Sequence, residues 1–301
     1  MPHVPTDAPG PAPGTAATGL HGFTHEYAET GGVQLHYVIG GRGPAVMLVH
    51  GWPFTWLEWR RLMRPLADRG FTVIAPDLRG CGASGKPPGP YSKRQTADDL
   101  HRLALHLGLT SVHVVGTDIG AMVAHAYAQA HPGQVHRLVL SEAFLPGYGL
   151  EEHMNPATGG FRHFGFHAQA GLAAMLTAGK EGLYLGGYWS MMSAGGITSQ
   201  DRAELLRAYQ APEAMRGGFE HYADLVADGR AARCGSRLPM PVLVLNGEHG
   251  LPQQVLLDGA CRAATDVSAD IVPAAGHTIG ADNPAWVAGR LAEFFAPGVS
   301  G

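Results

Sequence analysis

The sequence predicts an α/β protein whose mostly parallel sheet is covered by helices on both faces. Three observations predict this fold class. Short, continuous apolar runs, such as residues 45–50 and 111–116, have the composition of strands that are buried on both sides. Segments with helical spacing of apolar residues lie between these runs, and such alternation builds a parallel sheet. The alternation stops at residues 144–238, where helical pieces, aromatic residues and glycine-rich joints take its place.

The bulk composition limits the classes of protein and partner. The 301 residues are 45% hydrophobic, which is enough for one large core or a core with an insert. The net charge is −4 and no run is rich in Lys or Arg, so we expect neither nucleic acid nor a membrane as a partner. Three scattered cysteines argue against a disulfide framework and against a zinc site. They fit a reducing compartment, so we expect a cytoplasmic protein without metal or cofactor.

The first elements along the chain are a leader and an edge hairpin. Residues 1–21 are rich in Pro, Gly, Ala and Thr and lack the pattern of a signal peptide, so we expect a disordered leader. Alternating segments at 23–30 and 33–40 predict a hairpin at the sheet edge. A buried strand at 45–50 follows, and then a helix that ends near Gly70.

The remaining elements continue the alternation on both sides of the insert. Before it we expect a strand, a helix that Ser92 caps, and then a strand, a helix and a strand; they occupy residues 71–77, 92–109, 111–116, 119–131 and 135–143. After it we expect a strand, a helix, a strand and a last helix, within residues 241–295. The chain therefore divides into a core and a helical cap that is inserted after the sixth main strand. The core comprises residues 22–143 and 239–301, and the cap comprises residues 144–238.

Asp118 occupies a position where a hydrolase often carries a nucleophilic hydroxyl. The stretch "VGTDIGA" predicts a sharp turn from strand to helix, because Gly116 and Gly120 lack the Cβ atoms that would obstruct it. The helix N-terminus behind Asp118 favours a negative charge there. A carboxylate attacks a saturated carbon that bears a leaving group and forms an alkyl ester, which water then hydrolyses. The alternative role is that of an ordinary helix-capping aspartate.

The chemistry requires a base, an acid that orients it, and donors for an oxyanion. His277, in the loop "AAGH" after the last strand, is the expected base. The backbone N–H groups of Trp52 and Ile119 are the expected oxyanion donors. Glu142 and Glu248 both follow strands and are candidates for the acid. A third candidate comes after the histidine: it is Asp282, which we expect to cap the final helix.

The combined motifs resemble the α/β-hydrolase superfamily, in its branch of epoxide hydrolases and dehalogenases with an aspartate nucleophile. The matching pieces are "HGWP", "PDLRGCGASGKP", "YSKRQTADDL", "VGTDIGA", "LVLSEAFLPG" and "AAGH". The resemblance implies an α/β-hydrolase fold with a cap over Asp118. It also favours Glu142 as the acid, because Glu142 occupies the acid's place in a "MEAPLPG"-like run. The segment "GEHGLP" departs from the family's G-x-x-D form, which disfavours Glu248. In the loop "PDLRGCGASGKP" we expect Asp77 and Arg79 to brace neighbouring loops.

Two segments of the insert resemble a smaller bacterial group of epoxide hydrolases. The piece "FRHFGFHA" is similar to that group's W-H-F-x-F segment, and "GGFEHYADL" is similar to its F-E-Y-Y segment. The resemblance implies that His163 and Tyr222 donate hydrogen bonds to the epoxide oxygen. Taken without it, these two residues are more typical of a cap-core histidine and a helix aromatic. His163 and His167 have i, i+4 spacing, but no third ligand accompanies them, so no metal is expected.

The aromatic residues of the insert and of the Trp52 loop predict an apolar pocket. Phe164 and Trp189 are the residues that we assign to it. Further candidates for the lining of this pocket are Trp52, Phe166, Tyr184 and Phe219.

The resemblance and the motifs together predict an epoxide hydrolase that forms a vicinal diol through a covalent ester on Asp118. Its expected partner is a small-molecule epoxide, and a homodimer is left open. The alternative is a haloalkane or haloacid dehalogenase with the same nucleophile. Haloacetate dehalogenases usually carry His-Trp where this chain has His163 and Phe164, and a phenyl ring cannot donate to a halide. A third reading is a non-catalytic receptor for small ligands, which the presence of both Asp118 and His277 disfavours.

Overall fold

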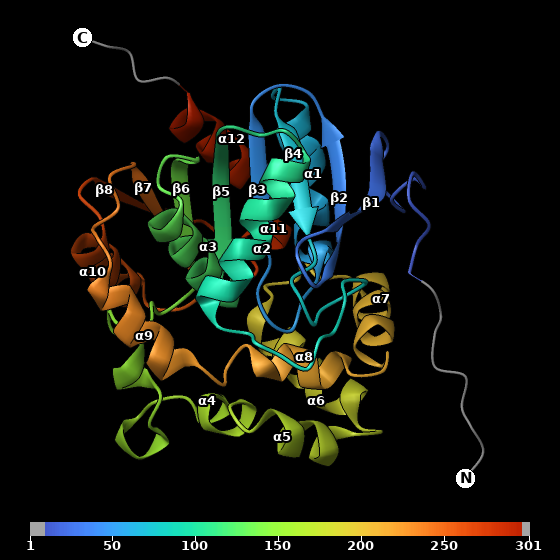
Figure 1. The fold of residues 1–301 in the computed structure, drawn as a ribbon, viewed down its shortest axis with the longest axis vertical. Coiled ribbons are helices and arrows are strands. Elements are labelled where there is room, and N and C mark those ends of the chain that lie inside the picture. The colour runs from blue at the N-terminus through green and yellow to red at the C-terminus, as the bar shows by residue number, and fades with distance from the viewer. Residues whose placement is uncertain (1–9, 297–301) are drawn as a thin grey trace.

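The computed structural model describes residues 10–296, and its centre is an eight-stranded sheet. The strands lie in the order β1-β2-β4-β3-β5-β6-β7-β8. The pairs β1–β2 and β2–β4 are antiparallel, and the other pairs are parallel. Helices cover both faces of the sheet, and α4 to α8 lie together beyond one end of it (Figure 1). The expected α/β class, a mostly parallel sheet flanked by helices, is confirmed.

The strands match the apolar runs of the sequence. They are β1 (Phe23–Glu29), β2 (Gln34–Gly41), β3 (Ala45–Val49), β4 (Thr72–Pro76), β5 (Val112–Thr117), β6 (Val135–Ser141), β7 (Val242–Gly247) and β8 (Val267–Val272). Every residue of β3, β5 and β7 is buried, as expected for parallel strands that helices cover on both faces. The edge strand β1 is only partly buried, with buried and half-buried residues interspersed.

The helices of the core lie between successive strands or follow the last strand. They are η1 (Trp56–Trp59), α1 (Arg60–Ala67), α2 (Lys93–His106), α3 (Ile119–Ala130), α10 (Gln253–Ala263), α11 (Ile279–Asp282) and α12 (Pro284–Phe295). The Ser92 hydroxyl caps α2 by accepting the Gln95 N–H at 3.2 Å, as expected. No helix within residues 10–296 has the length and apolar content needed to cross a bilayer.

The segment between β6 and β7 contains helices and no named strand within the described residues. They are η2 (Leu150–His153), η3 (Pro156–Thr158), α4 (Arg162–His167), α5 (Ala170–Thr177), α6 (Glu181–Met192), α7 (Ser199–Tyr209), α8 (Ala214–Glu220) and α9 (Leu225–Cys234). We call residues 144–238 the cap. Because β6 and β7 are neighbours in the sheet, the cap leaves and re-enters the core at one place.

The segment before β1 differs from the expected disordered leader over the part that the structure describes. Residues 1–9 lie outside the described residues. Ala16 forms a β-bridge with Thr24, and the Ala17 and Leu20 side chains are buried. The Tyr27 hydroxyl donates to the Pro11 carbonyl at 2.9 Å. Composition alone missed this packing because a few small apolar residues suffice to cover the edge strand.

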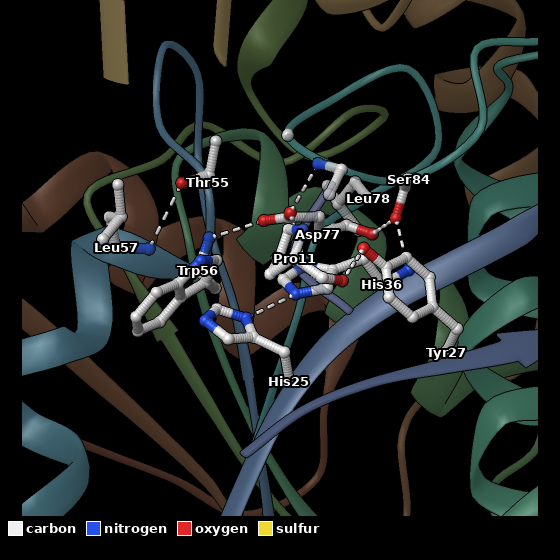
Figure 2. A network of polar contacts seen from close by, with 12 residues as sticks. Pro11, His25, Tyr27, His36, Thr55, Trp56, Leu57, Asp77, Leu78 and Ser84 are labelled. Atoms are coloured by element: carbon white, nitrogen blue, oxygen red, sulfur yellow. Dashed lines mark hydrogen bonds and ion pairs between the residues drawn. The ribbon is translucent and has the colours of Figure 1, made fainter. Parts of the chain in front are cut away.

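Asp77 joins the hairpin to the loops that follow β3 and β4 (Figure 2). Its Oδ1 accepts the Trp56 N–H at 2.8 Å, and its Oδ2 accepts the Ala83 N–H at 2.9 Å. The same Oδ2 lies 2.7 Å from His36 Nδ1, and His36 Nε2 lies 2.8 Å from His25 Nδ1. The expected bracing role of Asp77 is therefore confirmed. The loop after β3 carries Trp52, which belongs to the site described below.

Arg79 braces the same loop from the other side. Its Nε and Nη2 atoms donate to the two Asp99 carboxylate oxygens, each at 2.6 Å, and both side chains are buried. Its Nη1 also donates to the Pro90 carbonyl at 2.7 Å. Such a two-pronged pair fixes position as well as charge, so the loop after β4 is bound firmly to α2.

The Asp77 network predicts a large loss of stability on a small change. Asp77→Asn keeps one carbonyl acceptor but removes the charge and the second acceptor oxygen. We expect the free energy of unfolding to fall by about 2–4 kcal/mol, because a hydrogen bond to a charged group contributes about 1.5–3 kcal/mol. Urea unfolding at pH 7 measures the loss. The control is Asp68→Asn, which removes an exposed carboxylate paired with Arg64 and should cost about 0.5 kcal/mol or less. Equal losses in the two proteins would contradict this account.

Candidate active site

The turn at Asp118 forces a strained backbone that only glycine neighbours permit. Asp118 has φ 53° and ψ −127°, a conformation that L-residues rarely adopt and that costs about 1–3 kcal/mol. A Cβ on Gly116 would lie 2.3 Å from the Gly120 carbonyl oxygen. A Cβ on Gly120 would lie 2.2 Å from the Val49 carbonyl oxygen. The G-x-D-x-G pattern is therefore a steric requirement of this turn between β5 and α3.

The Asp118 carboxylate lies at the carboxyl ends of the parallel strands. Its Oδ1 accepts the Trp52 N–H at 2.9 Å from the loop that follows β3. The next backbone donor is the Ile119 N–H, the first of α3, where helical N–H groups have no acceptor within the helix. Of the two expected oxyanion donors, the Trp52 N–H is therefore bonded to Asp118 Oδ1, and the Ile119 N–H belongs to the next residue in the chain.

His277 lies between two carboxylates. Its Nε2 is 3.6 Å from Asp118 Oδ2, which is longer than a hydrogen bond, and its Nδ1 is 3.0 Å from Glu142 Oε2. Glu142 is fully buried and accepts the Gly247 N–H at 2.7 Å and the Leu251 N–H at 2.8 Å. These bonds fix the Glu142 carboxylate, and the carboxylate in turn fixes the orientation of the His277 ring.

The two carboxylates determine the charge of His277. Burial by itself lowers the pKa of the imidazole, but the attraction of the two adjacent carboxylates, Asp118 and Glu142, outweighs it and raises the pKa to about 10. The ring is therefore an imidazolium at neutral pH while both carboxylates carry their charge. It can act as a base only after one of those charges has been removed.

The two other candidate acids do not contact His277. Glu248 is exposed, and its Oε2 accepts the Ala274 N–H at 2.8 Å. Asp282 was expected to cap the final helix, but that prediction is wrong, because the Asn283 side chain caps α12 instead. Asp282 accepts hydrogen bonds from the end of α6 and from the His277 loop; the donors are the Ser193 hydroxyl, the N–H groups of Ala194, Gly196 and Gly276, and the Thr278 hydroxyl.

Asp118, Glu142 and His277 line a cavity of about 90 Å³ between the core and the cap. Its wall is mostly apolar. The lining residues besides these three are Trp52, Met122, Ala143, Phe144, Phe161, His163, Phe164, Tyr188, Met191, Met192, Tyr222 and Leu251. The cavity therefore suits a small, largely apolar molecule that presents a reactive centre to Asp118.

His163 and Tyr222 lie on the cap side of this cavity. Their ring centroids are 5.7 Å apart and the rings are nearly perpendicular. Burial lowers the pKa of His163, although Asp118 opposes the shift. Burial, with the Asp118 charge next in importance, raises the pKa of Tyr222 well above its ordinary value. At neutral pH both side chains therefore retain an N–H or O–H that can donate to a ligand oxygen.

The structure places Phe164 in the lining of this cavity and Trp189 outside it. Phe164 and Trp52 line the cavity. Trp189 is buried elsewhere and its Nε1 donates to the Pro53 carbonyl at 3.0 Å, so it ties α6 to the Trp52 loop. The other expected aromatics also lie outside the lining; they are Phe166, Tyr184 and Phe219. Their rings pack instead around the buried His167.

Several lining residues were not found from the sequence. Phe144 could have been found, because it comes two residues after Glu142 in a loop at the end of a strand. Tyr188 and Met191 lie on α6 and carry no local signal, since the packing of the cap alone decides which face of that helix meets the cavity. Glu58 was also missed; it is buried behind the Trp52 loop and accepts the Gly51 N–H.

Comparison with known proteins shows that this chain is similar to members of the alpha/beta hydrolase fold family. Residues 44–165 match the model of the alpha/beta hydrolase fold family. A soluble epoxide hydrolase of Corynebacterium sp. (strain C12) is 32% identical over 284 residues, which is 91% of this chain and 98% of that protein. A fluoroacetate dehalogenase of Burkholderia sp. is 31% identical over 253 residues, covering 77% of this chain and 80% of that protein. The solved structure of the epoxide hydrolase CorEH without ligand superimposes with a TM-score of 0.85 at 32% identity, covering 91% of this chain and 99% of that one.

The charge of His277 can be measured directly. In the unliganded protein we expect the ring to stay protonated through pH 8 and to lose its proton near pH 10. Asp118→Asn removes one of the two anions, so the pKa of His277 should fall toward its ordinary value. NMR of ring-labelled histidine across the pH range measures both. His125, whose pKa burial lowers to about 4, is the internal control and should be neutral throughout. A neutral His277 ring at pH 8 in the unmodified protein would contradict the assignment.

Proposed function

This chain belongs to the α/β-hydrolase family, in the branch of the soluble epoxide hydrolases, and we propose that it hydrolyses epoxides to vicinal diols through an ester on Asp118. One observation carries the proposal: the Asp118 carboxylate occupies the strained turn and lies 3.6 Å from the buried His277 imidazole. A hydroxyl at this position would suit acyl chemistry instead. A carboxylate needs no base to attack a saturated carbon. Relatives named as epoxide hydrolases support the assignment of the leaving group.

The first step forms the ester and opens the ring. Asp118 Oδ2 attacks an epoxide carbon while Oδ1 remains on the Trp52 N–H. The carbon–oxygen bond of the ring breaks, and its electron pair goes to the ring oxygen. Tyr222 and His163 face this cavity with their protons in place, so they hydrogen-bond the developing alkoxide and one of them protonates it. The product of this step is an alkyl ester on Asp118 with a free hydroxyl on the neighbouring carbon.

The second step hydrolyses the ester. His277 takes a proton from a water molecule, and the resulting hydroxide attacks Cγ of Asp118. Negative charge develops on Oδ1, where the N–H groups of Trp52 and Ile119 stabilise it. The tetrahedral intermediate collapses, and the diol leaves with the proton that His277 returns. The carboxylic acid that remains on Asp118 then gives its proton to His277, so Asp118 is a carboxylate again and the ring is an imidazolium. Glu142 stabilises the imidazolium during this step through its contact with Nδ1.

The change of charge on Asp118 coordinates the two steps. In the free enzyme, Asp118 and Glu142 together raise the pKa of His277. Ester formation removes the Asp118 charge, so the pKa of His277 falls and the ring releases its proton. That proton replaces the one that Tyr222 or His163 gave to the alkoxide, and His277 is then a base when one is required. Hydrolysis restores the charge and returns the ring to its protonated form.

Removal of a halide is the second candidate, because the fluoroacetate dehalogenase is also similar over most of its length. The first step would be the same, with a halide as the leaving group. Phe164 lines the cavity beside His163 and offers no N–H to a departing halide. We therefore place this reaction second. Fluoride release from fluoroacetate by the unmodified enzyme, with no turnover of epoxides, would reverse the order.

The covalent ester can be trapped by removing the base. His277→Gln should still be alkylated by styrene-type or aliphatic epoxides but should hydrolyse the ester about 10³-fold more slowly, because general base catalysis contributes about 10²–10⁴-fold. Intact-mass spectrometry should show a gain equal to the mass of one epoxide, and peptide mapping should place it on Asp118.

Asp118→Ala is the matched control. It should show neither turnover nor adduct with the same epoxides. The proposal fails if no epoxide in the panel alkylates His277→Gln, or if the added mass lies on another residue. Ligand binding without turnover in the unmodified protein would instead favour the non-catalytic receptor.

A further inference from the structure

Glu58 is a buried carboxyl that neither chemical step uses. It belongs to η1, its side chain is 1% exposed, and its Oε2 accepts the Gly51 N–H at 2.8 Å. Burial raises its pKa to about 8, although the bond from Gly51 and the charge of His277 oppose the shift. At pH 7 the group is therefore mostly a neutral acid whose carbonyl oxygen is an acceptor. Burying a carboxyl is costly, so its one backbone contact calls for a reason.

That contact fixes the peptide next to the oxyanion donor. The Gly51 carbonyl accepts the Phe54 N–H at 3.1 Å and lies 2.8 Å from His50 Nδ1. Because a peptide unit is planar and trans, holding the Gly51 carbonyl on one side aims the Trp52 N–H to the other side, toward Asp118. The bond from Gly51 N–H to Glu58 holds the preceding peptide unit. Both sides of Gly51 are thus fixed, and so is the direction of the Trp52 N–H.

Gly51 also lies directly against the nucleophile. A Cβ on Gly51 would be 2.5 Å from Asp118 Cβ and 3.0 Å from Asp118 Oδ1. A small shift of this residue would therefore either press on Asp118 or withdraw the Trp52 N–H from Oδ1, which now lies 2.9 Å away. The chain of contacts runs from Glu58 through Gly51 and Trp52 to Asp118.

We propose that Glu58 is a positioning residue for ester hydrolysis, holding Gly51 so that the Trp52 N–H meets Asp118 Oδ1 as negative charge develops there. This role rests on the proposed function. The two steps differ in what they require of the donor. In ester formation, charge leaves the Asp118 carboxylate, whereas in ester hydrolysis a full charge develops on Oδ1. A misplaced donor therefore slows hydrolysis more than ester formation, because only interactions that strengthen in the transition state change its rate.

Two variants of Glu58 separate positioning from mere packing. Glu58→Leu places an apolar side chain of similar size at this position and removes the acceptor. Glu58→Gln keeps a neutral carbonyl acceptor. Loss of an oxyanion donor costs about 10²–10³-fold, so a displaced donor should slow ester hydrolysis by about 10–100-fold. Ester formation should change less than about threefold. In rapid-quench experiments with an aliphatic epoxide, the ester should accumulate in Glu58→Leu and not in Glu58→Gln.

Each other outcome overturns the role. It is wrong if Glu58→Leu hydrolyses the ester at the unmodified rate, if both steps slow equally, or if Glu58→Gln behaves like Glu58→Leu. Glu58→Met serves the same comparison should the leucine variant not fold. The His277→Gln protein separates this test from the test of the proposed function. If an ester forms in His277→Gln but Glu58→Leu hydrolyses its ester at the normal rate, only the role of Glu58 is wrong. If no ester forms in His277→Gln, both the proposed function and the role of Glu58 are wrong.

Discussion

The backbone at Asp118 is held in a strained conformation, and the rest of the site depends on that constraint. With φ at 53°, the turn directs the carboxylate out of the sheet and against the Trp52 N–H. It persists because β3, β5 and α3 approach so closely that Gly116 and Gly120 have no room for a Cβ atom. The strain is supported by a parallel core whose central strands are entirely buried. A nucleophile held in this way loses little freedom when it reacts, which is the main physical advantage of the arrangement.

The position of the base depends on the cap as well as on the core. The backbone N–H of His277 donates to the Met192 carbonyl, at the end of α6, at 2.7 Å. The Asp282 carboxylate accepts hydrogen bonds from both the segment that follows α6 and the His277 loop. The cap also supplies His163 and Tyr222 to the same cavity. Hydrogen bonds therefore connect the cap, which carries His163 and Tyr222, to the loop that carries His277. Docking of the cap and orientation of the catalytic ring are parts of one structural unit.

Sequence reasoning succeeded where the signal is local. The turn at Asp118 is encoded within five residues, and the buried parallel strands are encoded in continuous apolar runs, so the fold class and the sharp turn at Asp118 followed directly. It failed where long-range packing decides. Trp189 was assigned to the pocket but donates to the Pro53 carbonyl, and Asp282 was assigned to a helix cap but accepts hydrogen bonds from the segment that follows α6. Tyr188 and Glu58 gave no signal, because their surroundings come from segments far apart in the chain.

Labelled water gives the most direct test of whether Asp118 bonds to the substrate. The experiment is one turnover of an epoxide in H₂¹⁸O with the enzyme in excess. If Asp118 is the nucleophile, the new oxygen of the first diol comes from its carboxylate, so that diol is unlabelled and mass spectrometry finds ¹⁸O in the peptide that contains Asp118. If water attacks the ring directly, the first diol carries ¹⁸O and Asp118 carries none. That second result would contradict the account.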